Sequence, residues 1–297
     1  MVRLLTGLLA LMSSCLVIAP VNAQETEYAI EEVRPDIYRY TAGSYRSLFW
    51  VTEDGIVVMD TLSTEAATRL KAELDARFDV PVRYVIYSHS HYDHSYGGEV
   101  FDEPCVTFIS HDLARQSMEI SGAQTVLADL TFADEMSLTL GDETLHLQYH
   151  GQNNGAGSVS MLIEEADLLY VVDWIVVGRM PWTNLEGYDI EGMIRSTCDI
   201  LAMDWDVFVG GHASIGDREG VEHYLGYIEA LHAAVRDGML EGKSLETLQA
   251  EIELPEYSDL LNYDAWLADN IGGVYRMLAD QNYILKRPEV VEGMQSE

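Results

Sequence analysis

The sequence predicts an α/β protein that ends in a helical extension. Short apolar runs alternate with segments in which apolar residues recur every three or four positions, and this alternation is typical of sheets covered by helices. After Gly238 only helical patterns remain. The chain has 297 residues, of which 48 % are hydrophobic, so it is long enough to bury a full core and is not disordered overall.

The expected elements follow one another in a regular order. Val57, Val58 and Met59 form the apolar centre of residues 55–60, which predicts a strand buried on both faces. Residues 64–78 have the apolar spacing of an amphipathic helix. Further strands are expected at 37–40, 47–52, 82–87, 106–109, 144–149, 158–163, 168–172 and 207–209, and further helices at 189–202, 218–236, from Ser244 onward and at 266–279.

The first 23 residues have the pattern of a secretory signal peptide. Arg3 gives a positive start, residues 4–19 are mostly apolar, and Val21-Asn22-Ala23 supplies the small residues of a cleavage site. Cleavage after Ala23 predicts a periplasmic or secreted protein without membrane insertion, because no later apolar run is long enough to span a bilayer. A lipoprotein cleavage site at Cys15 is the alternative, and Met12 matches that pattern poorly.

The composition restricts the partners and the chemistry of the chain. Acidic residues outnumber basic ones by 50 to 17, which gives a formal net charge of −33. Such a surface repels phosphate backbones and anionic headgroups, so we expect a small-molecule substrate and no nucleic acid. Neither Cys105 nor Cys198 lies in a C-x-x-C pair, so both are expected to be ordinary buried residues, and the sequence leaves their pairing open.

A dense group of metal-binding residue types follows the strand expected at 82–87. Residues 88–98 read S-H-S-H-Y-D-H-S-Y-G-G. Because side chains alternate along an extended chain, His89, His91 and Asp93 can point to one side while His94 turns elsewhere. Three imidazoles and a carboxylate within six residues suit a borderline-soft cation such as zinc, and the spacing allows two ions at one strand end.

This H-x-H-x-D-H segment resembles the hallmark of the metallo-β-lactamase fold superfamily. Later landmarks of that family recur in order, since Asp173 closes the strand at 168–172 and His212 follows V-F-V-G-G. The resemblance implies a four-layer αβ/βα sandwich over residues 24–238. The helical extension, residues 239–297, is then expected to pack on this main domain.

The resemblance also implies a role for each site residue. One ion would be bound by His89 and His91, and the other by Asp93, His94 and His212. Asp173 would bridge the two ions. Asp60, at the end of the strand at 55–60, would lie next to the ligands without binding the metal itself.

One position departs from the family pattern. The family supplies a third histidine for the first ion from a G-H-x-x-G loop, whereas the loop at 151–158 has Asn154 at that position. A carboxamide oxygen is a weaker zinc ligand than an imidazole. Three interpretations remain open: His150 takes the position, Asn154 coordinates weakly or through water, or the first ion is weak or absent.

The resemblance implies an exported zinc-dependent hydrolase with two ions, or with one if the Asn154 position is empty. Zinc lowers the pKa of a coordinated water from about 16 to near 7, and Asp93 would be the catalytic residue that orients it. The expected reaction is hydrolysis of an ester, lactone, thioester, lactam or amide. Two alternatives remain: a binding or scaffold protein whose metal site has decayed, and a single-iron oxygenase of the same fold.

Residues after Asp173 are the candidates for substrate contact. Lactamase members of the family often bind the substrate carboxylate with a Lys three positions after the equivalent Asp or Cys, and Val176 stands there in this chain. Trp174, Arg179 and Trp182 follow nearby, and the two tryptophans are candidates for the wall of an apolar pocket. We therefore expect an uncharged or mildly apolar ester, lactone or lactam as substrate.

Overall fold

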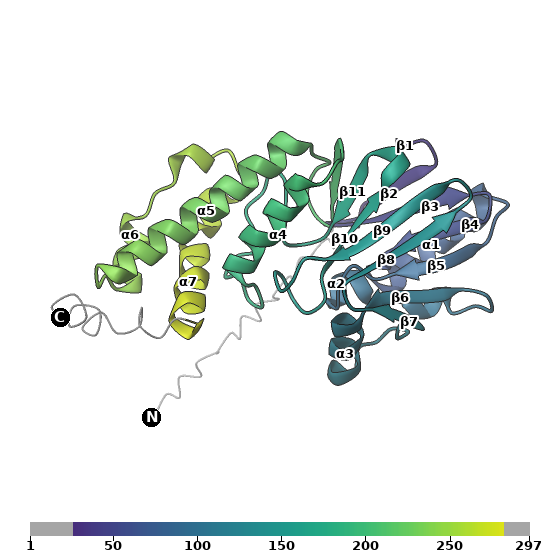
Figure 1. Ribbon diagram of the computed structural model, residues 1–297, viewed down its shortest axis with the longest axis horizontal. Coiled ribbons are helices and arrows are strands. Elements are labelled where there is room, and N and C mark those ends of the chain that lie inside the picture. The colour runs from purple at the N-terminus through teal and green to yellow at the C-terminus, as the bar shows by residue number, and fades with distance from the viewer. Residues whose placement is uncertain (1–25, 282–297) are drawn as a thin grey trace, which may run out of the picture.

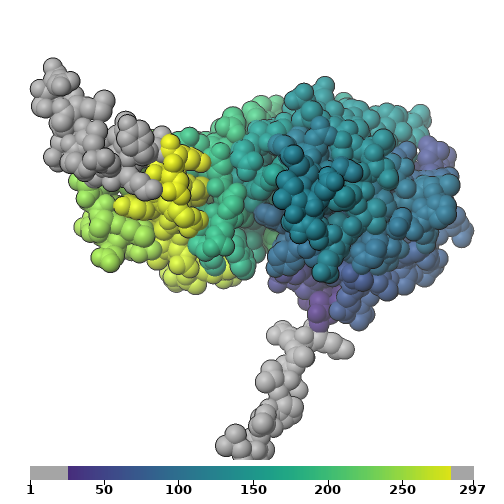
Figure 2. All heavy atoms as spheres, turned by 90° about the horizontal axis from the view of Figure 1, so that it is seen from below, coloured from purple at the N-terminus to yellow at the C-terminus, as the bar shows by residue number. Residues whose placement is uncertain are grey.

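The computed structural model describes residues 26–281, and the signal peptide predicted at 1–23 lies outside them. Two sheets pack face to face, and each carries helices on its outer face (Figure 1). This arrangement confirms the predicted αβ/βα sandwich. In the space-filling view the C-terminal helices gather at one end of the molecule and the sheets at the other (Figure 2).

Within residues 26–281, seven strands form the first sheet in chain order. They are β1 (Tyr28–Arg34), β2 (Ile37–Ala42), β3 (Tyr45–Thr52), β4 (Gly55–Met59), β5 (Val82–Ile86), β6 (Thr107–His111) and β7 (Leu130–Phe132). The first four pair antiparallel and the last four parallel. Each parallel pair needs a crossover; α1 (Thr64–Arg77) lies in the one between β4 and β5, α3 (Asp112–Ser121) lies in the one between β6 and β7, and both helices pack on the outer face.

Among the described residues, the second sheet has five strands, in the order β12-β11-β10-β9-β8. They are β8 (Glu135–Leu140), β9 (Glu143–Tyr149), β10 (Val159–Ile163), β11 (Leu168–Val171) and β12 (Val207–Gly210). Only β11 and β12 pair parallel among them. Their crossover contains α4 (Ile190–Ala202), and α5 (Arg218–Leu240) follows β12, so both helices cover the outer face.

The core between the sheets explains why the central strands are apolar. Every residue of β4, β10 and β11 is buried, because one face meets the other sheet and the opposite face meets helices. This confirms the prediction of a doubly buried strand at 57–59. Helix α1 begins where Ser63 accepts a hydrogen bond from the backbone N–H of Ala66, and it buries Ala67, Leu70 and Leu74 against the first sheet.

The C-terminal extension packs on the helical side of the second sheet. It comprises α6 (Leu245–Glu251), a 3₁₀ turn at Pro255–Tyr257 and α7 (Tyr263–Gln281). Ile271, Val274 and Leu278 of α7 join the same apolar cluster as α5. The Tyr227 hydroxyl donates a hydrogen bond of 2.8 Å to Asn270 Oδ1, which ties α7 to α5. The boundary expected after residue 238 falls inside α5, two residues before its end.

The expectation that both cysteines are buried was wrong. Cys105 and Cys198 are exposed and unpaired. Cys105 lies in a turn with a φ of +77°, shortly before β6, and Cys198 lies on the solvent side of α4, between the buried residues Thr197 and Ile200. Among the described residues, no helix is long and apolar enough to cross a membrane.

Candidate metal centre

The candidate site lies where strands of both sheets end. Asp60 follows β4 and His89 lies three residues beyond β5, while Asp173 and His212 each stand two residues beyond β11 and β12. Residues at the carboxyl ends of parallel strands meet at one edge, which is where ligands bind in open α/β sheets. His91, Asp93 and His94 follow in the loop and in the single turn α2 (Tyr92–Ser95). The first sheet therefore supplies the histidine motif, and the second supplies Asp173 and His212.

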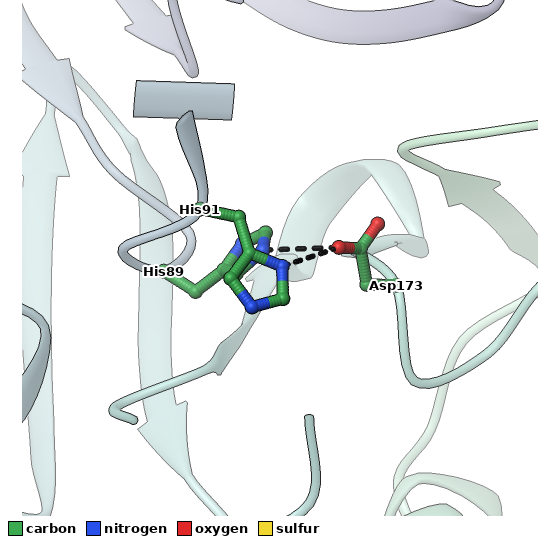
Figure 3. A group of neighbouring side chains, drawn as sticks. All are labelled: His89, His91 and Asp173. Carbon is green, nitrogen blue, oxygen red and sulfur yellow. Dashed lines mark hydrogen bonds and ion pairs between the residues drawn. The ribbon is translucent and has the colours of Figure 1, made fainter. Parts of the chain in front are cut away.

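Among the described residues, the first group of metal-ligand type is His89, His91 and Asp173. His89 Nε2 lies 3.0 Å and His91 Nδ1 lies 3.1 Å from the same carboxylate oxygen, Asp173 Oδ2 (Figure 3). His89 is fully buried, whereas a third of the His91 side chain is exposed. Both rings point toward the carboxylate from the opposite side of the site.

The second group is Asp93, His94 and His212. His94 Nε2 and His212 Nε2 are 3.2 Å apart, and Asp93 Oδ2 lies 3.8 and 3.9 Å from them. The other carboxylate oxygen, Asp173 Oδ1, lies 3.4 Å from His94 Nε2 and 3.1 Å from His212 Nε2. Asp173 thus stands between the groups, with one oxygen toward each.

Hydrogen bonds outside the site determine which ring nitrogens are free to act as ligands. Asp60 Oδ1 and Oδ2 accept 2.7 Å hydrogen bonds from the Ser88 backbone N–H and hydroxyl. Because the Ser88 hydroxyl proton points to Asp60, His89 Nδ1 must donate to Ser88 Oγ, 2.9 Å away. His212 Nδ1 donates to the Ser44 carbonyl oxygen at 3.0 Å. The Nε2 atoms of His89 and His212 therefore present lone pairs to the site.

The surroundings of His94 and His212 show that the residues fit a metal ion. His94 lies between two carboxylates, with Nδ1 3.5 Å from Asp60 Oδ2 and Nε2 3.4 Å from Asp173 Oδ1, and Nδ1 has no hydrogen-bond partner among the described residues. His212 Nε2, which presents a lone pair, lies 3.2 Å from His94 Nε2, and carboxylate oxygens lie beside both atoms. Such a concentration of lone pairs is unfavourable unless a cation lies among them.

The electrostatics of the site also favour positive charge. Burial lowers the pKa of His94, but the carboxylates of Asp173 and Asp60 outweigh it and raise that pKa well above its usual value. Burial raises the pKa of Asp173, but His94 and His89 hold it well below its usual range. The pKa of His89 is lowered by burial and by its neighbour His91. A buried carboxylate thus stays ionised among imidazoles.

Asp60 and Asp173 leave their strands in an uncommon backbone conformation. Their φ angles are +69° and +71°, in the left-handed region that non-glycine residues seldom occupy. Such strain is typical of functional sites, where the surrounding structure holds the residue in place. Here the Tyr170 hydroxyl donates a 3.0 Å hydrogen bond to Asp60 Oδ2 and helps to fix it behind the ligands.

The position of the missing third histidine contains a buried carboxamide. Asn154 is fully buried, and neither its Oδ1 nor its Nδ2 has a hydrogen-bond partner among the described residues. The next residue, Gly155, lies so close to His91 that a Cβ there would be 2.9 Å from His91 Nε2. The loop therefore lies in close contact with His91 of the first ligand group.

His150 is directed away from both ligand groups. Its Nε2 lies 2.8 Å from Ser160 Oγ on β10, and its Nδ1 lies 3.6 Å from an Asp199 carboxylate oxygen on α4. Both ring nitrogens are thereby engaged between the second sheet and its covering helix. This geometry disfavours the interpretation in which His150 supplies the third ligand.

A cavity of about 810 Å³ opens above the ligands. Its lining includes four of the predicted metal ligands, namely His91, Asp93, Asp173 and His212, whereas His89 and His94 are fully buried beneath. The aromatic residues of its wall are Tyr45, Tyr92, Tyr96, Trp182, Tyr188 and Trp266. A volume of this size accommodates a small-molecule ligand.

The candidate substrate contacts divide in two. Arg179 and Trp182 line the cavity, as expected. Trp174 does not, so the expectation that it contacts the substrate was wrong: the side chain is fully buried in the apolar cluster between the second sheet and its helices. Tyr188 and Trp266 also line the cavity but were not singled out from the sequence, because no local motif connects them with the histidines.

Comparisons with known proteins agree with this fold. The model of the metallo-beta-lactamase superfamily matches residues 42–255. A metallo-beta-lactamase from Pontibacter korlensis superposes with a TM-score of 0.62 at 18 % identity, over 68 % of this chain and 99 % of that one. The structure of TMB-1 superposes with a TM-score of 0.60 at 19 % identity, over 68 % of this chain and 97 % of that one.

A curated relative extends the comparison beyond the lactamases. The alpha subunit of 2,4-dinitroanisole O-demethylase from Nocardioides sp. strain JS1661 is 24 % identical over 251 residues, which are 82 % of this chain and 73 % of that protein. The two solved structures share only the fold with this chain at their level of identity. The family match, however, covers well over half of the sequence, and the chain belongs to the metallo-β-lactamase superfamily.

Proposed function

We propose that this protein is an exported, zinc-dependent hydrolase. One observation carries the proposal: the two oxygens of Asp173 face two separate ligand groups, an arrangement in which one carboxylate can bridge two ions. His89 and His91 would hold one ion, and Asp93, His94 and His212 the other. Histidine nitrogens and carboxylate oxygens are the ligands of zinc in catalytic sites.

When bound there, zinc supplies hydroxide near neutral pH and polarises a carbonyl oxygen. Side chains of the protein would position the water and the ligands. Asp93 is partly exposed at the cavity floor, so its carboxylate is placed to orient the attacking water and to accept its proton. Tyr45 packs edge-on against His212 with ring centroids 5.5 Å apart and holds that ring in place. The bond to be hydrolysed belongs to an ester, lactone, thioester, lactam or amide.

The first experiment is elemental analysis of the protein purified without chelators or added metal. We expect two zinc ions per chain, together with turnover of a 4-nitrophenyl ester. Asp173→Ala removes the bridging oxygens and should abolish turnover and lower the metal content, while circular dichroism stays unchanged. His223→Ala is the matched control, because His223 pairs with Asp259 away from the cavity. Wild-type turnover in Asp173→Ala would overturn the proposal.

Other metal contents would select the alternatives. Less than one metal per chain without turnover would favour a binding or scaffold protein. Iron in place of zinc, with consumption of oxygen, would favour the single-iron oxygenase, since the superfamily includes both hydrolases and oxygenases.

Removal of a methyl group from an aryl ether is a second candidate reaction. Two observations favour it: the relative named as a 2,4-dinitroanisole O-demethylase subunit, and the aromatic wall of the cavity. Written as a hydrolysis, hydroxide adds to the ring carbon that bears the methoxy group, the bond from that carbon to oxygen breaks, and methoxide leaves with a proton as methanol. With ¹⁸O-labelled water, label in the phenol and unlabelled methanol would support this route, whereas formaldehyde would exclude it.

A further inference from the structure

The C-terminal extension reaches the candidate active site. Leu261, Asn262 and Trp266 line the same cavity as the metal-ligand residues, although they lie beyond residue 255, where the family match ends. Two backbone hydrogen bonds fasten them to the loop after β11: the Met180 N–H donates to Leu261 O at 3.1 Å, and the Leu261 N–H donates to Gly178 O at 3.0 Å. This wall therefore has a fixed position relative to Asp173.

The extension contributes one half of an aromatic pair. The rings of Trp266 and Trp182 meet at an angle of 66° with centroids 5.5 Å apart. Trp182 is nevertheless 54 % exposed, and Tyr92, elsewhere on the cavity wall, is 65 % exposed. Large aromatic faces that remain exposed inside a cavity are suited to a flat ring, because offset and edge-on contacts between rings add to the gain from burial.

A guanidinium group lies at the same wall. Arg179 Cζ is 5.5 Å from the centroid of the Trp266 ring, and Arg179 is the single Lys or Arg among the described residues that line the cavity. Its Nε atom is buried and has no hydrogen-bond partner within the described part of the chain. Burial lowers the pKa of Arg179, yet a guanidinium stays charged at neutral pH.

The remaining charges show which end of the cavity suits an anion. Apart from Arg179 and the metal-ligand residues, the described lining of the cavity contains one charged residue, the carboxylate Glu186. No ion pair between Arg179 and a carboxylate occurs among residues 26–281, so the guanidinium keeps its donors for another partner. An oxygen-bearing anionic group of a substrate is the partner that fits it.

We propose that the extension completes the pocket and, together with Arg179, makes it selective for flat aromatic substrates that carry an anionic group. This inference rests on the hydrolase proposed above and names its substrate class. The ring packs on the exposed face of Trp182, beside Trp266, the anionic group lies at Arg179, and the bond to be broken faces Asp173. It replaces the uncharged substrate that the sequence led us to expect.

Calorimetric titration with three probes tests the inference without turnover. Benzenesulfonate has a flat ring and a charge, cyclohexanesulfonate keeps the charge without the flat ring, and methyl phenyl sulfone keeps the ring without the charge. We expect zinc-loaded wild-type protein to bind benzenesulfonate at least about tenfold more tightly than either of the others. Equal affinity for benzenesulfonate and cyclohexanesulfonate would overturn the aromatic part, and equal affinity for the sulfonate and the sulfone the anionic part.

Variants assign the two preferences to their residues. Trp266→Ala should weaken benzenesulfonate about tenfold and leave cyclohexanesulfonate nearly unchanged, whereas Trp266→Phe should retain most of the affinity because it keeps a ring. Arg179→Gln should weaken both sulfonates and spare the sulfone. Arg236→Gln is the matched control, since Arg236 pairs with Asp237 and does not line the cavity. Wild-type binding by both Trp266→Ala and Arg179→Gln would overturn the inference.

The two proposals fail in different ways. If the probes bind as expected but no ester is hydrolysed, the hydrolase is refuted and the pocket assignment stands. If esters are hydrolysed but the probes show no preference, only the substrate class is refuted.

Discussion

Replacing Asn154 by leucine separates the stability of the fold from the affinity for metal. The carboxamide is fully buried with both polar atoms unpartnered among the described residues. Each such atom costs about 1–3 kcal/mol, and leucine has the same branched arrangement of side-chain heavy atoms without polar atoms. We therefore expect Asn154→Leu to raise the free energy of unfolding of the metal-free protein by about 2 kcal/mol. The same change removes the carboxamide oxygen at the position of the missing histidine and should lower the occupancy of the first ion.

The neighbouring residue provides a matched control. Asn153 is also fully buried, but its Oδ1 accepts a hydrogen bond from the Asn154 N–H and its Nδ2 donates one of 3.2 Å to Ser196 Oγ. Asn153→Leu leaves the buried N–H without an acceptor, so it should lower the free energy of unfolding by about 1–3 kcal/mol.

Urea denaturation of chelator-treated protein measures both variants, and elemental analysis measures their metal content. If Asn154→Leu raises the free energy of unfolding and Asn153→Leu lowers it, the Asn154 carboxamide destabilises the metal-free fold, and its role lies in the metal site. If Asn154→Leu destabilised the protein as much as Asn153→Leu does, the carboxamide would be satisfied in the fold and our account of this position would be wrong.

Three further outcomes test the surroundings of the ligands. Asp60→Asn weakens the acceptor that holds Ser88 and faces His94, so the affinity for zinc should fall about 10- to 100-fold in competition with a chromogenic chelator; an unchanged affinity would show that Asp60 does not position the ligands. His150→Ala should retain the wild-type metal content, because both ring nitrogens are engaged elsewhere; loss of one ion would identify His150 as a ligand. Removing the metal with a chelator should lower the free energy of unfolding by about 3 kcal/mol for each ion bound, relative to protein in zinc at about 100 times the dissociation constant of each site; equal denaturation curves would argue against binding to the folded state.

The sequence predicted the buried elements well and the exposed ones poorly. The strand expected at 168–172 and the helix expected at 189–202 agree with the structure to within one residue, because an unbroken apolar run or an apolar stripe reflects burial directly. Strand β8 and helix α3 were missed. Burial in β8 falls on alternate residues and is complete only at Leu140, and α3 buries only Ala114 and Met118, so neither has a strong apolar pattern.

The same contrast applies to the candidate site. The residues expected to bind metal come from a short motif and from strand ends, and topology brings such positions together at one edge. The cavity wall depends instead on packing over long separations. Trp266 reaches the cavity from a helix near the end of the chain, whereas Trp174, adjacent to Asp173, turns into the core. Proximity in sequence is a poor guide to which aromatic residues face a pocket.

The division of the ligands between the two sheets has a consequence for how the protein assembles. A chain in which only the first half has folded would present His89, His91 and His94 without the carboxylate of Asp173 between them. Zinc uptake during refolding would then report the docking of the two halves, not the formation of either one. In the zinc-bound protein the ions would link ligands from both sheets, so the two halves of the chain would separate only after the zinc had dissociated.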